Sequence, residues 1–307
     1  MRRLLGLLGV VALAIGLTPH AAYAWTPGTH VFLGEAVMRS LDGLPGAVAD
    51  LLRAYPYDFL YGSIAADTSV AKKYAPAGRH CHSWTVGFEV YRRAPDGPLR
   101  AFAFGYLAHL AADAVAHNFF VPRQLAVTSS TSAIGHSYWE SRFETHLGEG
   151  VSRRARELIL IDHSRSDEHL DRILSPTIFS TQMNRRIFRG MVVVSDSESW
   201  QRIFQLLAEN SRWDLADDDV ARYLDRSYDF VIDLLTRLDR SEPLALDPSG
   251  ESPLRDAKRV RRAALRRGGI WSAARAATHR FALPPSTLSY AAALAAPLYR
   301  PARATSS

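Results

Sequence analysis

Three residues with metal-binding side chains recur at four-residue intervals in one apolar segment. His109, Asp113 and His117 are separated mainly by small or apolar residues within residues 105–117. In an α-helix this spacing stacks side chains one turn above another on the same face. Burying such polar groups without partners is costly, whereas Zn²⁺ accepts imidazole nitrogens and carboxylate oxygens as ligands. The segment therefore predicts a helix with a metal site on one face.

A second pair with helical spacing supplies further ligands, which are needed because one helix cannot surround a metal ion. His136 and Glu140 are four residues apart and follow a loop rich in serine and threonine. Their side chains share a helix face. The pair can therefore close a second site with His117.

Two more candidate ligand groups precede this helix. Asp67 is a lone carboxylate at the end of an apolar run, and His80 and His82 flank Cys81. Either histidine alone is ambiguous. Cys81 ranks below them because, in an extended segment, its side chain would point away from both neighbours.

The N-terminus has the pattern of an export signal. Two arginines follow Met1, an apolar stretch covers residues 4–17, and Ala22-Tyr23-Ala24 has the small-x-small pattern of a cleavage site. The apolar stretch is shorter than the roughly 20 residues of a membrane-spanning helix. We expect residues 1–24 to be a signal peptide and the protein to be exported, periplasmic or secreted, by an undecided route.

Cleavage at this position would make Trp25 the first residue of the mature chain. A free α-amine has a pKa of about 8 and can form a five-membered chelate with the carbonyl of its own residue. Pro27 and Gly28 turn the chain so that His30 can reach the same ion. Such a site exists only after the signal peptide has been removed.

Composition and periodicity predict an all-α fold. Hydrophobic residues make up 47% of the chain, which suffices for a core, and a single cysteine excludes an intramolecular disulfide. Helical periodicity is common, as in residues 31–38, 102–120 and 223–235, and strand signals are scarce. We expect a multi-helix bundle with the metal site in its core.

The expected domain covers residues 25–240, and residues 241–307 form a linker and a basic, alanine-rich tail. Nine Lys or Arg residues against Asp256 occur between Arg255 and Arg280. Such a stretch is either a solvated helix face or a surface for nucleic acid or anionic lipid headgroups. The alanine-rich residues 288–299 are too short to cross a membrane. They fit an interfacial anchor, a tail that docks on the domain, or a partly disordered end.

These motifs together resemble the bacterial zinc-dependent phospholipase C family and, more distantly, the fungal single-strand-specific zinc nucleases. The resemblance covers roughly residues 25–148. It rests on Ala24-Trp25, Thr29-His30, Tyr57-Asp58-Phe59-Leu60-Tyr61-Gly62, His82-Ser83-Trp84, the helix from His109 to His117, and His136 with Glu140.

The resemblance implies three zinc ions in an all-helical protein. By this mapping one ion is held by Asp67, His82, His109 and Asp113, and a second by His117, His136 and Glu140. The third is held by the Trp25 amine and carbonyl with His30, and Asp113 bridges it to the first. His82 is chosen because it stands before Ser83-Trp84, with His80 as the alternative.

The implied reaction is metal-assisted hydrolysis of a phosphodiester, in which no amino-acid nucleophile is needed. By family analogy, Asp67 orients or deprotonates the attacking water as well as binding metal. Glu140 is the phospholipase residue where the nucleases carry Asp. The interval from Trp25 to His30 is short, as in the nucleases. Residues 26–29 contain no acidic residue of the kind choline-preferring enzymes carry, so choline preference is not supported.

The leading prediction is a phospholipase C that converts phospholipids to diacylglycerol and a phosphorylated headgroup, with a phospholipid or membrane surface as partner. A zinc-dependent nuclease for single-stranded DNA or RNA is the first alternative. A zinc-stabilised, non-catalytic binding module is the second. No protein partner is predicted.

Overall fold

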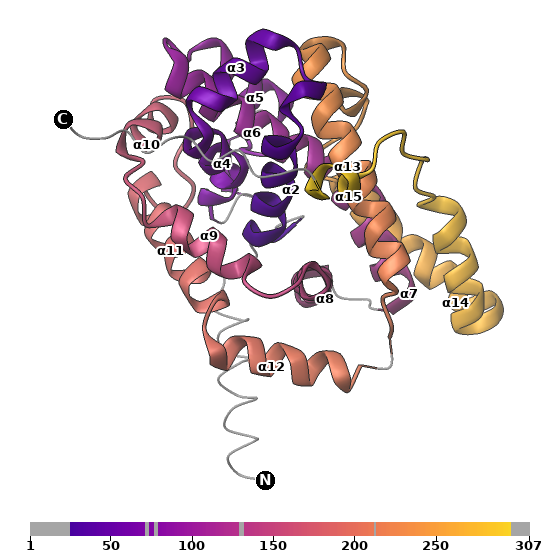
Figure 1. The fold of residues 1–307 in the computed structure, drawn as a ribbon. Helices are drawn as coiled ribbons and strands as arrows, with labels where there is room; N and C mark the ends of the chain where they lie inside the picture. Colours follow the sequence, from indigo (N-terminus) through magenta and orange to yellow (C-terminus); the bar gives the residue numbers. More distant parts are fainter. Residues whose placement is uncertain (1–24, 71–73, 77–78, 129–131, 212, 296–307) are drawn as a thin grey trace.

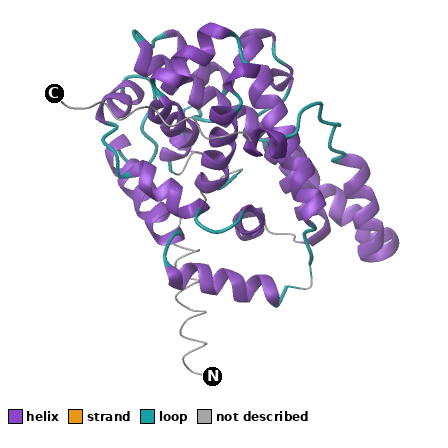
Figure 2. Ribbon diagram, in the orientation of Figure 1, coloured by secondary structure: helices purple, strands orange, loops and turns teal. Residues whose placement is uncertain are grey.

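The computed structural model describes residues 25–295, apart from residues 71–73, 77–78, 129–131 and 212. The predicted signal peptide, residues 1–24, lies outside the described residues, as does the end of the predicted tail. Within the described part of the chain there are helices and loops and no strand (Figure 2). The predicted all-α fold is confirmed.

The helices follow one another along the chain and are joined by loops and short helical turns (Figure 1). The first half contains α2 (Pro27–Arg39), α3 (Gly46–Ala54), α4 (Pro56–Ala65), α5 (Trp84–Arg92), α6 (Gly97–Val115), α7 (Val121–Thr128) and α8 (Ser132–Glu144). The second half contains α9 (Val151–Ile159), α10 (Ser164–Asp171), α11 (Thr181–Ser195), α12 (Glu198–Glu209), α13 (Asp217–Arg237), α14 (Glu251–Arg280) and α15 (Tyr290–Ala295). Short 3₁₀ turns cover Leu41–Gly43 (η1), Ala66–Thr68 (η2), Thr145–Leu147 (η5), Leu238–Arg240 (η6) and Glu242–Ala245 (η7), and a π-helical turn covers Ala116–Phe120 (η4).

Helix α6 runs through the core of the bundle. Every residue from Ala101 to Val115 is buried, so the helix is enclosed on all sides. A helix that is apolar around its whole circumference must be covered by neighbours, and α4, α5 and α13 pack against it. Its N-terminus is capped by Asp96, whose carboxylate accepts a hydrogen bond from the Leu99 amide. Side chains on α6 are therefore placed in a dry, rigid environment.

Two glycines allow α4 and α6 to cross with their backbones in contact. A Cβ atom at Gly62 would lie 2.0 Å from the Phe102 carbonyl oxygen, and one at Gly105 would lie 2.0 Å from the Phe59 carbonyl oxygen. No side chain larger than a hydrogen atom fits at either position. The crossing fixes the height of α6 relative to α4.

The chain after α13 returns to the body of the protein. The backbone N–H of Tyr290 donates to Asp225 Oδ1, and the ring of Tyr290 lies 6.0 Å from that of Phe32, so α15 rests on α13 and α2. Helix α14 packs along α7. In the part of the chain that the structure describes, every helix is too short or too polar to span a bilayer.

Candidate metal centre

Five of the predicted ligands converge at the centre of the bundle, and we call them the first cluster. They come from α2, the η2 turn, the loop before α5, and α6, and each is at most 2% exposed. The first cluster consists of His30, Asp67, His82, His109 and Asp113.

Asp113 lies in the middle of the first cluster. Its Oδ1 is 3.1 Å from His30 Nε2, and its Oδ2 is 3.2 Å from His109 Nε2 and 3.0 Å from His82 Nε2. Asp67 Oδ1 approaches the same His82 nitrogen at 3.3 Å. The two carboxylate oxygens of Asp113 thus face different histidines, which is the arrangement expected of a carboxylate that bridges two ions.

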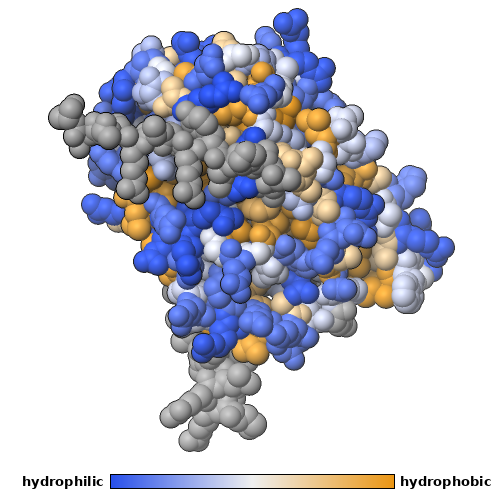
Figure 3. All heavy atoms as spheres, in the orientation of Figure 1, coloured by the Kyte–Doolittle hydropathy of each residue, from blue (hydrophilic) through white to orange (hydrophobic). Residues whose placement is uncertain are grey.

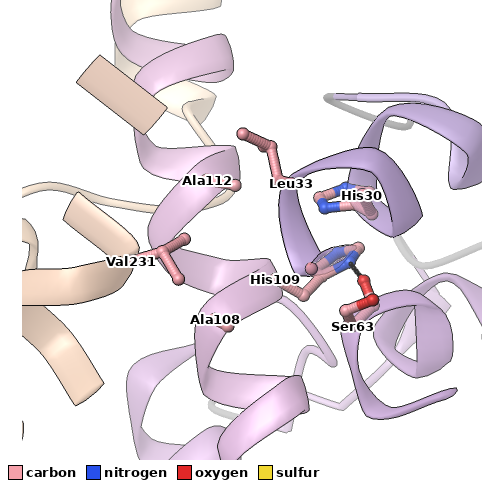
Figure 4. Close-up of a pocket in the computed structure, with 8 residues that line it drawn as sticks. His30, Leu33, Ser63, Ala108, His109, Ala112 and Val231 are labelled. Atoms are coloured by element: carbon pink, nitrogen blue, oxygen red, sulfur yellow. Dashed lines mark hydrogen bonds between the residues drawn. The ribbon is translucent and has the colours of Figure 1, made fainter. Parts of the chain in front are cut away.

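A backbone carbonyl determines which ring nitrogen of His109 is available to bind a metal ion. His109 Nδ1 lies 2.8 Å from the Ser63 carbonyl oxygen (Figure 4). A carbonyl oxygen only accepts hydrogen bonds, so Nδ1 carries the proton and the lone pair is on Nε2. Zinc-binding histidines are typically held in this way. Ser63 is brought to this position by the crossing of α4 and α6.

The second cluster comprises His117, His136 and Glu140, whose donor atoms all lie within 4.8 Å of one another. His136 Nε2 is 2.7 Å from Glu140 Oε1, as expected for residues one turn apart on α8. The rings of His117 and His136 are perpendicular, with centroids 5.2 Å apart. His117 belongs to the π-helical turn η4, which continues α6. Such turns often occur at functional sites.

Three successive carbonyls of the loop before α14 contact residues around the second cluster. The Leu246 carbonyl accepts from Trp84 Nε1 at 2.8 Å, the Asp247 carbonyl from Asn118 Nδ2 at 2.8 Å, and the Pro248 carbonyl from His117 Nδ1 at 2.6 Å. His117 Nε2 is buried and has no hydrogen-bond partner. The tautomer and the orphaned Nε2 both fit a metal ligand.

Gly250 is the N-cap of α14 and lies directly against His117. Its φ is +59°, and a Cβ atom there would lie 2.4 Å from His117 Cβ. Both the backbone conformation and the space require glycine. The predicted linker thus forms a wall of the second cluster, while the division of the chain into a domain and a tail stays a prediction.

Burial and neighbouring charges set the protonation of both clusters. Burial opposes ionisation of Asp113, but His109 and His30 outweigh it and hold the pKa of Asp113 well below its usual range. Burial and the neighbouring His109 lower the pKa of His30 to about 4. Burial lowers the pKa of His117 to about 3. At neutral pH His30 and His117 are therefore neutral imidazoles and Asp113 is a carboxylate, the forms that bind zinc.

The structure separates the two candidate histidines around Cys81. His82 Nε2 faces Asp67 and Asp113, whereas His80 Nδ1 accepts a hydrogen bond from the His82 backbone N–H. This geometry favours His82 as the ligand. Cys81 Sγ lies 3.2 Å from His82 Nδ1, so the expectation that it points away from both histidines is wrong. The reason is that residues 81 and 82 form a bend instead of an extended segment.

Trp25 is anchored through its side chain, a role that the sequence did not indicate. The indole is fully buried against Phe120 and Phe143, and Nε1 donates to the Ala112 carbonyl at 3.1 Å. Ala112 directly precedes Asp113, so the anchor holds Trp25, the predicted first residue of the mature chain, beside the first cluster. The role of the Trp25 amine and carbonyl as ligands stays a prediction.

Glu144 holds the start of α2 in place, a role that the sequence did not indicate. Its buried carboxylate accepts hydrogen bonds from Thr26 Oγ1 and Ser152 Oγ, and burial raises its pKa. Thr26 caps α2, which carries His30. Glu144 comes one turn after Glu140, and this continuation of the ligand face of α8 is the sequence signal for it.

Two further buried histidines, His163 and His169, do not belong to either cluster. His163 stacks on Tyr61 and its Nε2 lies 2.8 Å from the Leu158 carbonyl, while His169 Nε2 lies 3.0 Å from the Val90 carbonyl. Contacts with backbone carbonyls thus account for the burial of both imidazoles.

Comparison with known proteins yields one clear relationship. No curated protein and no solved structure matches the chain significantly. The family model described as zinc-dependent phospholipase C matches residues 29–184, about half of the chain. The matched residues include all of the first and second clusters. The chain therefore belongs to the zinc-dependent phospholipase C family, a family of hydrolases.

Proposed function

We propose that the protein is an exported phospholipase C that hydrolyses phospholipids to diacylglycerol and a phosphorylated headgroup. The observation that carries the proposal is the presence of two buried donor clusters, joined by the continuous run from α6 into η4 that carries His109, Asp113 and His117, within the residues that match the family. One cluster has Asp113 between three imidazole nitrogens. The other has three protein ligands, the number found in catalytic zinc sites.

Different residues have different roles in the proposed hydrolysis. Zinc held by these residues would supply Lewis-acid chemistry, which polarises a phosphoryl group and makes water more acidic. Asp67, whose Oδ1 lies 3.3 Å from the ligand nitrogen Nε2 of His82, orients the attacking water and accepts its proton. The carbonyls of Ser63 and Pro248 hold His109 and His117 in the tautomer that leaves Nε2 free. No serine or cysteine nucleophile is required.

Export and activation are coupled in this proposal. The amine of Trp25 becomes available as a ligand only after residues 1–24 have been removed, and the buried indole already holds this residue next to Ala112. A precursor that retains Ala24 would lack the ion held by Trp25 and His30. Mass spectrometry of the mature N-terminus tests this directly, since a start other than Trp25 would remove that ion from the proposal.

The decisive experiment counts zinc in the purified, processed protein and assays it in parallel on mixed phospholipid vesicles and on single-stranded nucleic acid. We expect two or more zinc ions and release of diacylglycerol. Asp67→Asn should lose the activity, and Asp239→Asn, which changes an exposed carboxylate far from both clusters in sequence, should retain it.

Two outcomes would overturn the proposal. Cleavage of nucleic acid alone would make the protein a nuclease. Zinc binding without hydrolysis of any phosphodiester would make the metals structural.

A further inference from the structure

Helix α14 (Glu251–Arg280) consists of two arms that form a hairpin. The helical conformation breaks at Gly268 and Gly269, where Gly269 has a φ of +67°. The second arm returns along the first, because Arg280 Nη2 lies 2.6 Å from Asp256 Oδ2 near the start of the helix. Residues 265–271 form the tip of the hairpin. The tip is therefore at the opposite end of the hairpin from Gly250, which contacts the second cluster.

The hairpin is fixed to the protein along its arms and not at its tip. Its buried residues beyond Asp256 are all small, namely Ala257, Ala264, Ala273 and Ala277. The first arm packs on α7, and Arg261 Nη1 donates to the carbonyl of Ala126 at 3.3 Å. At the tip, by contrast, a Cβ atom added to Gly269 would meet nothing within 4 Å. The tip residues thus contribute little to the stability of the fold.

Large hydrophobic side chains nevertheless lie at this tip. Trp271 is 81% exposed, the highest value among the exposed large hydrophobic residues of the described chain, and Leu265 is 41% exposed. Ile270 between them is half-buried. A single exposed apolar residue needs no explanation, but a tryptophan held in water beside a leucine indicates a surface that is covered in use.

The charge around the tip is positive and uncompensated. At the base of the hairpin, Arg255, Arg259 and Arg280 pair with Glu251 or Asp256. Among the described residues, no carboxylate pairs with the exposed side chains nearer the tip, which are Arg262, Arg266, Arg267 and Arg275. In the space-filling view, the α14 region at the right-hand edge shows hydrophilic and hydrophobic residues next to one another (Figure 3).

We propose that the α14 tip is a docking site for an anionic lipid bilayer. Tryptophan is favoured at the boundary between headgroups and acyl chains, and arginines flanking it bind lipid phosphates. Single-stranded nucleic acid is bound mainly in grooves that follow its backbone, whereas this tip is the end of a hairpin and carries the aliphatic side chains of Leu265 and Ile270 beside Trp271. The proposal does not depend on hydrolysis, and the membrane contact that it adds is remote from the metal clusters.

The test is sedimentation of the full processed protein with vesicles of phosphatidylcholine, with and without phosphatidylserine, at low and high salt. We expect binding that requires phosphatidylserine and weakens with salt. Arg266→Gln with Arg267→Gln should weaken it about 25-fold, since each cation near the surface contributes about a factor of five. Trp271→Ala should weaken it about tenfold, and Trp271→Phe should restore most of the loss.

Matched controls change exposed residues elsewhere on the protein. Arg153→Gln with Arg186→Gln removes the same charge from α9 and α11, and Leu160→Ala removes an apolar side chain that is 69% exposed. Both should leave binding unchanged. Equal weakening by these controls, or absence of binding to vesicles, would overturn the proposal. So would preferential, Trp271-dependent binding of a single-stranded oligonucleotide. Because binding is measured without turnover, failure here is distinguishable from failure of the proposed activity.

Discussion

The two metal-ligand clusters are close along the chain but are held in place by different parts of it. The first cluster relies on contacts within residues 25–113, including the Ser63 carbonyl and the glycine crossing of α4 with α6. The second relies on Pro248 and Gly250, which lie beyond the residues matched by the family model. The matched segment therefore carries all the proposed ligands but not everything that orients them.

The largest effect should come from the crossing beneath the first cluster. Gly105→Ala would place a methyl group 2.0 Å from the Phe59 carbonyl oxygen, so two buried backbones must separate. We expect a loss of at least about 3 kcal/mol of unfolding free energy, or no soluble protein. Thermal unfolding measures this effect.

Gly190→Ala in α11 is the matched control, because nothing lies within 4 Å of its added Cβ. It should be neutral or stabilising by about 0.5–1 kcal/mol. A Gly105→Ala variant as stable as wild type would show that the crossing does not fix the first cluster.

The next largest effect concerns how many zinc ions are lost when a ligand in each cluster is replaced. Asp113→Asn should abolish activity and remove more than one ion, because both oxygens of Asp113 face ligands of the first cluster. Glu140→Gln, in the second cluster, should remove only one. Metal analysis of the purified variants measures both. Loss of a single ion from Asp113→Asn would contradict its bridging role.

A smaller effect on zinc affinity is expected when Gly250, in the wall of the second cluster, is replaced. Gly250→Ala would bring a methyl group to 2.4 Å from His117 Cβ, moving a ligand without removing it. We expect zinc affinity at that cluster to fall about 10–100-fold, as for other groups that orient zinc ligands, while the first cluster keeps its zinc. Competition with a chelator resolves the two classes of ion.

Gly150→Ala is a close control for this variant. Gly150 also precedes a helix with a positive φ of +83°, but the nearest atom to its added Cβ is Arg154 Nη1 at 3.8 Å. It should cost about 1 kcal/mol through backbone strain and leave zinc binding unchanged. Equal loss of zinc in both variants would assign the effect to strain and not to the contact with His117.

These contacts explain how far the sequence predicts the structure. Spacing along one helix is local information, so the approach of His109 to Asp113 and of His136 to Glu140 follows from four-residue intervals. The family membership and the all-α fold are confirmed as well. The contact of Pro248 with His117 joins residues 131 apart through a backbone carbonyl, which every residue carries. No side-chain pattern can report such a contact.

The glycines were visible in the sequence, but their partners were not. Gly62 and Gly105 interrupt apolar helices, and an isolated glycine in a helix can signal close packing. Which two backbones meet depends on the tertiary arrangement. The same holds for Trp25, which was interpreted only through its amine although its indole is fully buried.

Acid should destabilise the metal-free protein through one histidine of each cluster, His30 and His117. Burial lowers the pKa of His30 to about 4 and that of His117 to about 3, whereas in the unfolded chain both should titrate at about 6.5. Between these values the unfolded state binds more protons than the folded state, so stability rises with pH. Each group contributes up to about 1.4 kcal/mol per pH unit.

The unfolding free energy of chelator-treated protein should therefore fall as pH decreases from 7 to 5, and urea titrations at several pH values measure this slope. Removing the second-cluster group by His117→Gln should reduce that slope, and an unchanged slope would mean that His117 is already protonated in the folded protein.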